Sequence, residues 1–404
     1  MNILNFIVAS LIVCAGCSAD NNIPEPDTTG PSVETDAPNT DYSPAFAGQT
    51  RINAVRTAAA FQVNTITTGL SAPWGITSLP DGRLLITEKG GSMRIVNLDG
   101  GVSNTIGGIP RVNSAGQGGL LGLCLDPSFE SNRMVYWVFS EPAASGNLTS
   151  VAKGRLADNE TTLEATAVIY RSNTPYNGNA HYGGRVIFDG TGNLLVSTGE
   201  RSAMETRQMA QSISSSLGKV IRITTDGQPA PGNPAFNQSG ALPELFTIGH
   251  RNPQGLAIHP ITGEVWLSEH GPRGGDEINR LQAGINYGWP VITYGIEYSG
   301  QPVGGGIQQQ EGMEQPVYYW DPVISPSGMT FYKGSRIPEW ENNLFIGSLS
   351  GTHIVRLVID NNRVTGEERL LANEGQRFRD ITQGIDGALY AVTDQGRLYR
   401  IDNE

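Results

Sequence analysis

One strand-turn-strand pattern recurs six times along this chain, and it restricts the possible folds more than any other feature. Each copy has a small or glycine-containing start, an apolar strand, a turn with Asp or Gly, and a second apolar strand. The copies span residues 74–88, 120–139, 184–200, 254–269, 327–348 and 380–394. Short strands between such turns, with 51 glycines in 404 residues, are typical of an all-β protein.

Six irregularly spaced copies predict a six-bladed β-propeller. A single small sheet cannot bury both of its faces, whereas sheets packed radially around an axis bury them against each other. A β-sandwich or a solenoid is the alternative, but neither explains six similar units. In a propeller the first strand of each blade lines the central channel, so polar residues just before these strands should converge. Residues 204–217 are expected to hold the one short helix.

The first 17 residues have the features of a signal peptide of the lipoprotein type. Residues 3–13 are largely apolar but too few to span a bilayer, which suits the central part of a signal peptide. The run Cys-Ala-Gly-Cys at 14–17 resembles a lipoprotein processing site, with Cys17 as the lipidated end. We therefore expect export to the periplasm or cell envelope, with membrane contact through this anchor; simple secretion is the alternative.

Residues 18–56 are rich in Asp, Asn, Thr and Pro and show no apolar period. Such a composition predicts a flexible linker, because it buries too little apolar surface to offset the entropy of ordering. The propeller domain would then be residues 57–404. Within it, Cys124 lies in the apolar run 120–125 and is expected to be a core residue, since a single cysteine cannot form an internal disulfide.

The net charge of the chain argues against some classes of partner, and three of its arginines indicate a local basic site. The net charge of -12 argues against a general nucleic-acid or anionic-membrane surface. Arg377 and Arg379 are two residues apart, so on an extended segment both guanidinium groups point to one side and suit carboxylates or phosphates. An exposed ion-paired strand is the alternative reading. With Arg251 before another blade, three cations would repel each other in one channel without an anion between them.

Two further segments have residues suited to binding a cation and to accepting a proton. The tight loop containing Gly271 and Pro272 has main-chain carbonyls that can turn towards a cation, and calcium accepts such ligands; a plain surface loop is the alternative. His181 stands before the third repeat, and its ordinary pKa lets an imidazole accept a proton at neutral pH, although a lone histidine is more often structural. The histidines lack zinc-site spacing, and no Gly-x-Gly-x-x-Gly opens a helix after a strand, so a Rossmann nicotinamide or flavin site is not expected.

The ordered motifs of the chain resemble those of the soluble aldose sugar dehydrogenases that depend on pyrroloquinoline quinone (PQQ). The resemblance runs from about residue 63 to 401. Its motifs are Gly-Gln-Gly-Gly-Leu-Leu-Gly at 116–122, His-Tyr-Gly-Gly-Arg at 181–185, Gly-His-Arg-Asn-Pro-Gln-Gly at 249–255, Glu-His-Gly-Pro-Arg-Gly-Gly-Asp-Glu-Ile-Asn at 269–279, Asn-Tyr-Gly-Trp-Pro at 286–290 and Arg-Phe-Arg-Asp at 377–380.

This resemblance implies oxidation of an aldose to a lactone, with the electron acceptor and oligomeric state left open. His181 would be the general base for the anomeric hydroxyl while hydride passes to the quinone, and Arg251 would be the second catalytic residue. The residues implied around PQQ are Gln117, His181, Arg251, Asn252, Arg377 and Arg379. The calcium ligands implied are the carbonyls of Gly271 and Pro272 at PQQ, and Glu277 with the main chain of Tyr287 at a second, structural calcium.

Three positions depart from the glucose dehydrogenase branch of this family. Ala180 stands where that branch has Asp before the catalytic histidine, so another group must orient the imidazole. Ser350 replaces a cofactor-binding Lys, and Val323 replaces a cofactor-contacting Thr. The alternatives are a calcium-dependent propeller lactonase without a redox cofactor, and a non-catalytic sugar-binding propeller at the cell surface.

Overall fold

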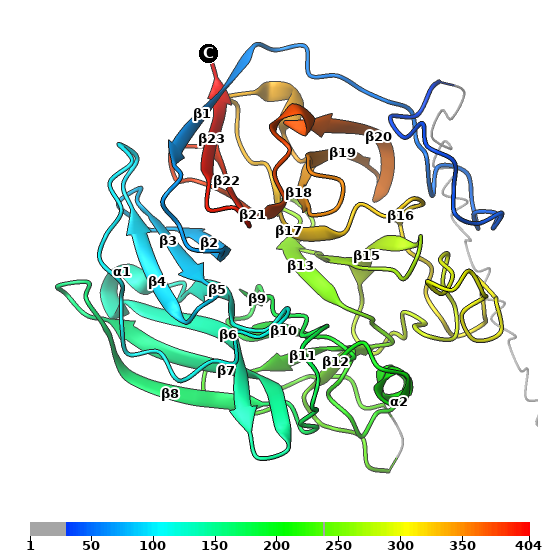
Figure 1. Cartoon of the computed structure of the whole chain (residues 1–404), viewed down its shortest axis with the longest axis horizontal. Helices are drawn as coiled ribbons and strands as arrows, with labels where there is room; N and C mark the ends of the chain where they lie inside the picture. The colour runs from blue at the N-terminus through cyan, green and yellow to red at the C-terminus, as the bar shows by residue number, and fades with distance from the viewer. Residues whose placement is uncertain (1–29, 237–238) are drawn as a thin grey trace, which may run out of the picture.

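Six antiparallel sheets follow one another around a central axis in the computed structural model, which describes residues 30–236 and 239–404 (Figure 1). The predicted six-bladed β-propeller is therefore confirmed. Each sequence repeat forms the first two strands of one blade; the connection between them is short in four blades and contains a helical turn in the second and fifth. In the first blade that connection contains Asp81 and Gly82, and Gly82 adopts a φ of +90°, which glycine reaches without strain.

The strands of each blade are consecutive in sequence, except in the last blade. The first three blades are β2(Pro73–Ser78), β3(Leu84–Glu88), β4(Ser92–Val96); β5(Leu120–Leu125), β6(Met134–Ala143), β7(Gly146–Leu156), β8(Leu163–Arg171); and β9(Val186–Phe188), β10(Leu194–Thr198), β11(Lys219–Ile223), β12(Leu245–Ile248). The others are β13(Pro253–Ile258), β14(Val265–Glu269), β15(Asp276–Leu281), β16(Tyr318–Trp320); β17(Pro326–Phe331), β18(Leu344–Ser348), β19(Ile354–Asp360), β20(Arg363–Leu370); and β21(Phe378–Gln383), β22(Leu389–Thr393), β23(Leu398–Asn403) with β1(Phe61–Thr67).

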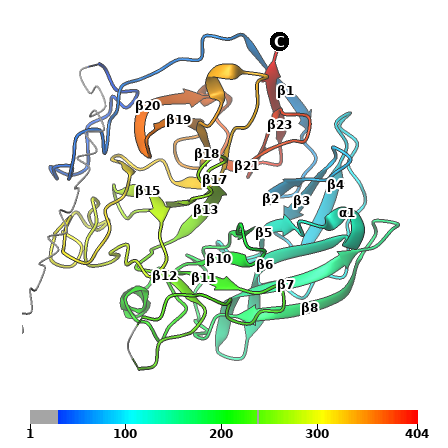
Figure 2. The same ribbon diagram turned by 180° about the vertical axis from the view of Figure 1, so that it is seen from behind.

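The sixth blade closes the ring by joining the two ends of the domain. Strand β1 pairs antiparallel with β23, with Phe61 opposite Asn403 and Asn64 opposite Arg400. The closure is visible from both sides, where the first and last strands lie together (Figures 1 and 2). Pairing the first strand with the last gives the final blade its outer strand without a separate element.

Apolar side chains fill the space between neighbouring blades rather than one central core. Trp137 of β6 packs in a cluster with Leu85 of the preceding blade, and both side chains are fully buried. Trp266 of β14 meets Phe331 of the next blade edge to face, with ring centroids 5.8 Å apart. Comparable clusters lie at all six blade interfaces, so each sheet buries both faces, as radial packing requires.

Glycines in the first strands allow the blades to approach the axis closely. A Cβ on Gly328 would lie 1.7 Å from Asp380 Oδ1, and a Cβ on Gly122 would lie 2.6 Å from the carbonyl oxygen of Gly184. No side chain fits at either position. The glycine-containing starts of the sequence repeats therefore reflect crowding at the axis.

The described part of the expected linker is not a flexible segment. Residues 30–56 lie along the outside of the fourth and fifth blades, and Ile52 is fully buried in the apolar cluster between them (Figure 1). Gln49 is also buried and donates from Nε2 to the carbonyl of Pro316 at 2.9 Å. Composition missed this because a few well-placed contacts, not an apolar period, anchor the segment. The expected signal peptide and Cys17 lie outside the described residues.

Helices are few and short in the part of the chain that the structure describes. The helix expected in 204–217 is a single turn, α2(Met204–Arg207), followed by the 3-10 turn η1(Gln208–Ala210). The others are α1(Phe129–Asn132), η2(Pro338–Trp340) and η3(Ala372–Glu374). Among the described residues, no helix has the length and apolar character needed to cross a bilayer.

Candidate active site

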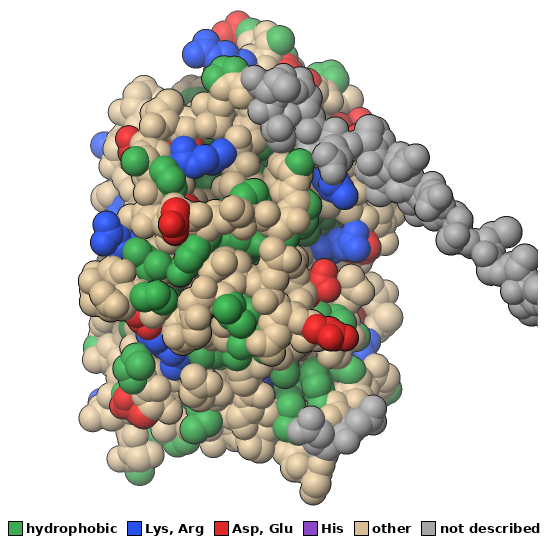
Figure 3. Space-filling view, turned by 90° about the vertical axis from the view of Figure 1, so that its right-hand side faces the viewer, with side chains coloured by type: hydrophobic (Ala, Val, Ile, Leu, Met, Phe, Trp, Pro, Cys, Tyr) green, Lys and Arg blue, Asp and Glu red, His purple; other side chains and the backbone are tan. Residues whose placement is uncertain are grey.

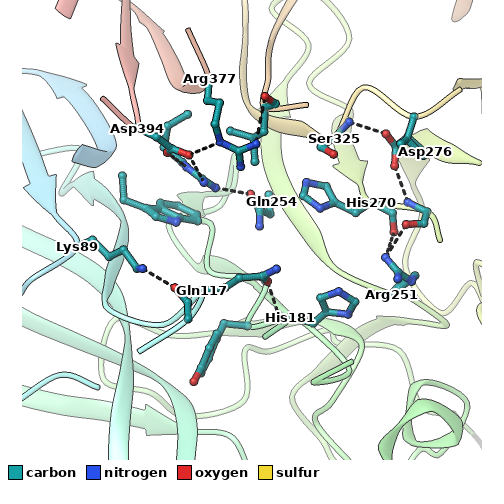
Figure 4. Close-up of a pocket in the computed structure, with 18 of the residues that line it drawn as sticks. Lys89, Gln117, His181, Arg251, Gln254, His270, Asp276, Ser325, Arg377 and Asp394 are labelled. Atoms are coloured by element: carbon teal, nitrogen blue, oxygen red, sulfur yellow. Dashed lines mark hydrogen bonds and ion pairs between the residues drawn. The ribbon is translucent and has the colours of Figure 1, made fainter. Parts of the chain in front are cut away.

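A cavity of about 530 Å³ opens at one end of the central channel, where segments from all six blades meet (Figure 4). The convergence expected from propeller geometry is present. Seven of the ten predicted site residues line this cavity: Gln117, His181, Arg251, Gly271, Pro272, Arg377 and Arg379. They come from loops widely separated in sequence, and only closure of the ring brings them together.

Three other predicted site residues do not line this cavity. Asn252 is fully buried behind it, and its Oδ1 accepts a hydrogen bond from the Gly183 main-chain N at 3.1 Å. Asn252 therefore supports the loop after His181 from behind. Glu277 and Tyr287 lie beside a separate space of about 10 Å³, enough for one small group.

His181 faces the cavity from the loop before β9, in a left-handed conformation with φ +46°. Its main-chain N donates to Gln117 Oε1 at 2.8 Å, and its ring is 2.6 Å from Glu200, measured from Nδ1 to Oε1. The side chains of His181 and Glu200 are both buried. Glu200 thus takes the orienting role that the missing Asp at position 180 left open. Sequence reasoning did not identify Glu200, although it ends the third repeat, two residues after β10.

Burial shapes the protonation of this pair. It holds the pKa of His181 well below its usual range, and Arg251 and Arg201 lower it further. Burial also raises the pKa of Glu200 to about 7. The imidazole is therefore neutral at pH 7. When Glu200 is ionised it can only accept, so Nδ1 carries the proton and Nε2 has a lone pair available.

Arg251 links the histidine side of the cavity to the glycine-rich loop. Its Nη1 donates to the carbonyl of Gly271 at 2.6 Å and to that of His270 at 3.2 Å. The guanidinium lies over the Trp289 ring, 5.2 Å from its centroid. Arg251 Nε is buried with no hydrogen-bond partner among the described residues. This donor of the Arg251 guanidinium is therefore unsatisfied by the described part of the protein.

Arg377 and Arg379 do share one side of the cavity, as expected, but the protein supplies an anion between them. Asp394 accepts from Arg377 Nε at 2.9 Å and from Arg379 Nε at 2.7 Å. Arg379 Nη1 also donates to Gln254 Oε1 at 2.9 Å. Repulsion between these arginines therefore does not by itself demand an anionic ligand, because Asp394 relieves part of it.

The cavity nevertheless keeps an excess of positive charge. Lys89, which the sequence reasoning did not select, lines it and donates to the Gly116 carbonyl (Figure 4). Burial and then the Arg379 charge lower the pKa of Lys89. The charged residues of the lining are Lys89, Arg251, Arg273, Arg377 and Arg379 against Asp276 and Asp394. Such a concentration of cations in a protein of net charge -12 favours an anionic ligand here.

A buried ion pair supports Trp74 and Gln254, two residues that line the cavity. Arg185 Nη1 lies 2.6 Å from Asp380 Oδ2, and Arg185 Nε donates to the carbonyl of Gln254 at 2.9 Å. The Arg185 guanidinium also lies 4.7 Å from the centroid of the Trp74 ring, which lines the cavity. Trp74 is thereby held as a flat, rigid side of the site.

The loop that carries Gly271 and Pro272 is held by one carboxylate. Asp276 Oδ1 accepts from the Gly271 main-chain N at 2.7 Å, and its Oδ2 accepts from Ser325 N at 2.6 Å. Burial raises the pKa of Asp276 to about 7. Gly271 has no room for a side chain, since a Cβ would lie 2.3 Å from Gly275. The loop is therefore built from main chain, as a site of carbonyl ligands requires.

Carboxylates gather beside the smaller space. Asn279 Nδ2 donates to both Glu269 Oε1 and Glu277 Oε2 at 3.1 Å, so two acidic side chains share one amide. Burial, and next the Glu269 charge, raise the pKa of Glu277 well above its usual range. No group of three or more His, Cys, Asp or Glu side chains suited to a metal occurs within 30–236 and 239–404. A cation here would need main-chain oxygens as well, such as that of Tyr287.

The two other departures lie at the cavity edge. Val323 lines the cavity, whereas Ser350 Oγ lies 2.8 Å from Ser325 Oγ. The serine pair leaves a neutral region where a lysine would bring charge. Lys89, which contacts Gly116, lies on a different side of the cavity from Ser325 (Figure 4).

Comparisons with known proteins agree on one family. Residues 70–400 match the model of the glucose/sorbosone dehydrogenase family. The aldose sugar dehydrogenase YliI of Escherichia coli is 39% identical over 348 residues, covering 85% of this chain and 93% of that protein. An uncharacterized Synechocystis protein is 38% identical, covering 99% of this chain and 98% of its own. The PQQ-bound aldose sugar dehydrogenase of Streptomyces coelicolor has a TM-score of 0.71 at 29% identity, covering 86% of this chain and 100% of that one.

Proposed function

The chain belongs to the glucose/sorbosone dehydrogenase family, and from that premise we propose that it is a PQQ- and calcium-dependent aldose dehydrogenase. It oxidises the anomeric carbon of an aldose to a lactone. The observation that carries this proposal is His181, which lines a cavity with a positively charged side and is held from behind by buried Glu200. The pair supplies a neutral base, and the charge suits an anionic cofactor.

The residues of the cavity fit PQQ, which is a planar tricarboxylate. Lys89, Arg377 and Arg379 present cations on one side, and Trp74 presents a flat ring. Arg251 Nε is a buried donor with no partner among the described residues. When bound, PQQ would supply the quinone carbon that accepts the hydride. The carbonyls of Gly271 and Pro272 would hold the calcium beside it, and Glu277 with the Tyr287 main chain a second calcium.

The protein's own part in the reaction is to position the sugar and take its proton. His181 Nε2 accepts the proton of the anomeric hydroxyl as the anomeric C–H leaves as hydride, so the two-electron oxidation is balanced. Glu200 then stabilises the positive charge on the imidazole through Nδ1. Arg251, whose guanidinium lies against the Gly271 carbonyl, offers positive charge where negative charge develops.

The test is reconstitution of the purified apoprotein with PQQ and calcium, followed by dye reduction with a panel of mono- and disaccharides. We expect reduction with at least one aldose, its loss on chelation and its return with calcium. A folded protein that binds PQQ but oxidises no sugar would support the sugar-binding propeller. Lactone hydrolysis that needs calcium but no PQQ would support the lactonase.

The activity should fall on the acid side with an apparent pKa near that of Glu200. Burial raises that pKa to about 7. A protonated Glu200 donates to Nδ1, which moves the ring proton to Nε2 and blocks the base. We therefore expect kcat at saturating sugar to drop about tenfold per pH unit below this pKa and to level off above it. A kcat that stays flat from pH 5 to 9 would contradict this assignment.

The proposal includes location outside the cytoplasm. The expected signal peptide at residues 1–17 and lipidation at Cys17 would place the enzyme in the periplasm or cell envelope. Sugar and electron acceptor would then be met there.

A further inference from the structure

We propose that residues 30–56, here named the strap, hold the cation-binding loop 271–275 in its binding conformation and so raise the calcium affinity of the site. The calcium role of that loop rests on the proposed function. The holding role does not, because it is a matter of contacts between two described segments. The strap precedes residue 70, where the match to the family model begins.

The strap is firmly attached to the outer strands of two blades. Its Gln49 carbonyl accepts from Tyr319 N of β16 at 2.8 Å, and Val55 N donates to the carbonyl of Glu367 in β20 at 2.9 Å. Ile52 is buried between these blades. Figure 3 views the molecule from this side, where acidic and basic side chains are interspersed rather than gathered by sign. The strap is thus held on the two blades by specific contacts.

One buried carboxylate joins the strap to the fourth blade. Asp321, which directly follows β16 and is 4% exposed, accepts four hydrogen bonds from two strap residues. Asn39 donates from its main-chain N at 2.9 Å and from Nδ2 at 2.7 Å, both to Oδ1. Thr40 donates from N and Oγ1 to Oδ2, each at 3.0 Å. Because the buried carboxylate of Asp321 accepts all four of these hydrogen bonds, it fixes the positions of Asn39 and Thr40 on the fourth blade.

The same asparagine reaches the cation-binding loop. Asn39 Oδ1 accepts from Arg273 Nε at 2.9 Å, so the amide binds Asp321 with its nitrogen and Arg273 with its oxygen. Arg273 directly follows Pro272, one of the two proposed carbonyl ligands. Gly274 packs on the same carboxylate, because a Cβ there would lie 2.8 Å from Asp321 Oδ1. Gly275 N also donates to the Trp320 carbonyl at 2.9 Å.

A glycine-rich loop needs such support to bind a cation well. Glycine loses more conformational freedom on ordering than any other residue, and Gly271, Gly274 and Gly275 lie within five positions. Contacts that order the loop in advance reduce the entropy lost on binding. The strap supplies such a contact at Arg273, from a part of the chain more than 230 residues away. Its role is therefore positioning rather than catalysis.

The test compares Asn39→Ala with the wild-type chain and with Ser43→Ala, which changes an exposed side chain of the same strap. Hydrogen exchange is measured on peptides covering 271–275 and, as a reference, on β6. Calcium affinity is derived from the dependence of the melting temperature on calcium concentration. We expect about tenfold faster exchange in 271–275, unchanged exchange in β6, and severalfold weaker calcium binding, as loss of hydrogen bonds to charged groups implies. Ser43→Ala should match the wild type in all three measurements.

The two measurements, hydrogen exchange and calcium affinity, separate this inference from the proposed function. Unchanged exchange in 271–275, or equally faster exchange in β6, would overturn the holding role of the strap. If calcium does not stabilise the wild-type chain at all, the calcium proposal fails, and with it the claim about affinity. Faster exchange confined to 271–275 would still support the strap as the element that holds this loop.

Discussion

Replacing His181 with alanine should lower kcat by about 10³-fold while the protein still folds and binds PQQ. His181 Nε2 is the proposed base, and a positioned base contributes roughly 10²- to 10⁴-fold. Its side chain is held by Glu200 and not by the cationic side of the cavity, so its loss leaves Arg377 and Arg379 in place. The measurement pairs kcat from dye reduction with PQQ affinity from titration of the apoprotein.

The matched control is His259→Ala. His259 is also a buried histidine, but it lies in the turn after β13 and its ring packs on Phe331, 4.8 Å between centroids. Its replacement should change stability more than kcat. The base assignment fails if His181→Ala keeps kcat within about threefold of the wild type.

Replacing Glu200 with glutamine should lower kcat by about 10²- to 10³-fold with little change in KM. Ser202 N donates to Glu200 Oε2 at 3.2 Å, so a glutamine would turn its oxygen towards that donor. Its NH₂ group then faces His181 Nδ1 and donates to it, which leaves the ring proton on Nε2. The base is present but in the wrong tautomer. The corresponding change in the Ser-His-Asp triad costs about 10⁴-fold.

Two measurements distinguish this tautomer effect from a structural one. The acid limb of kcat near pH 7 should disappear in Glu200→Gln, because the titrating carboxyl is gone. A control, Glu205→Gln, changes an acidic residue that is hydrogen-bonded to the Tyr176 hydroxyl at 2.5 Å on the surface. It should keep both the rate and the pH profile. A Glu200→Gln enzyme with wild-type rate and the same acid limb would remove Glu200 from the mechanism.

Much of the fold could be predicted from the sequence because it is encoded locally. Each copy of the repeat, with its apolar strands and its turn, is only about 20 residues long. Each copy forms the first two strands of one blade. The same repeats predicted that Gln117, His181 and Arg251 would meet, since first strands line the channel of any propeller. The strap was misread because its composition resembles a linker, and its few anchors, such as Ile52, are visible only against the blades they contact.

The sequence alone determined the number of blades, the closed ring and the set of loops that reach the cavity, because period and turn chemistry act between near neighbours. Tertiary structure decided which side chains became partners. Glu200 turns to His181, Asp394 lies between two arginines, Lys89 supplies a cation from the first blade, and Asn39 reaches Asp321 across 282 positions. Such pairings depend on distances set by closing the ring and packing six sheets, and no local pattern in the chain encodes those distances.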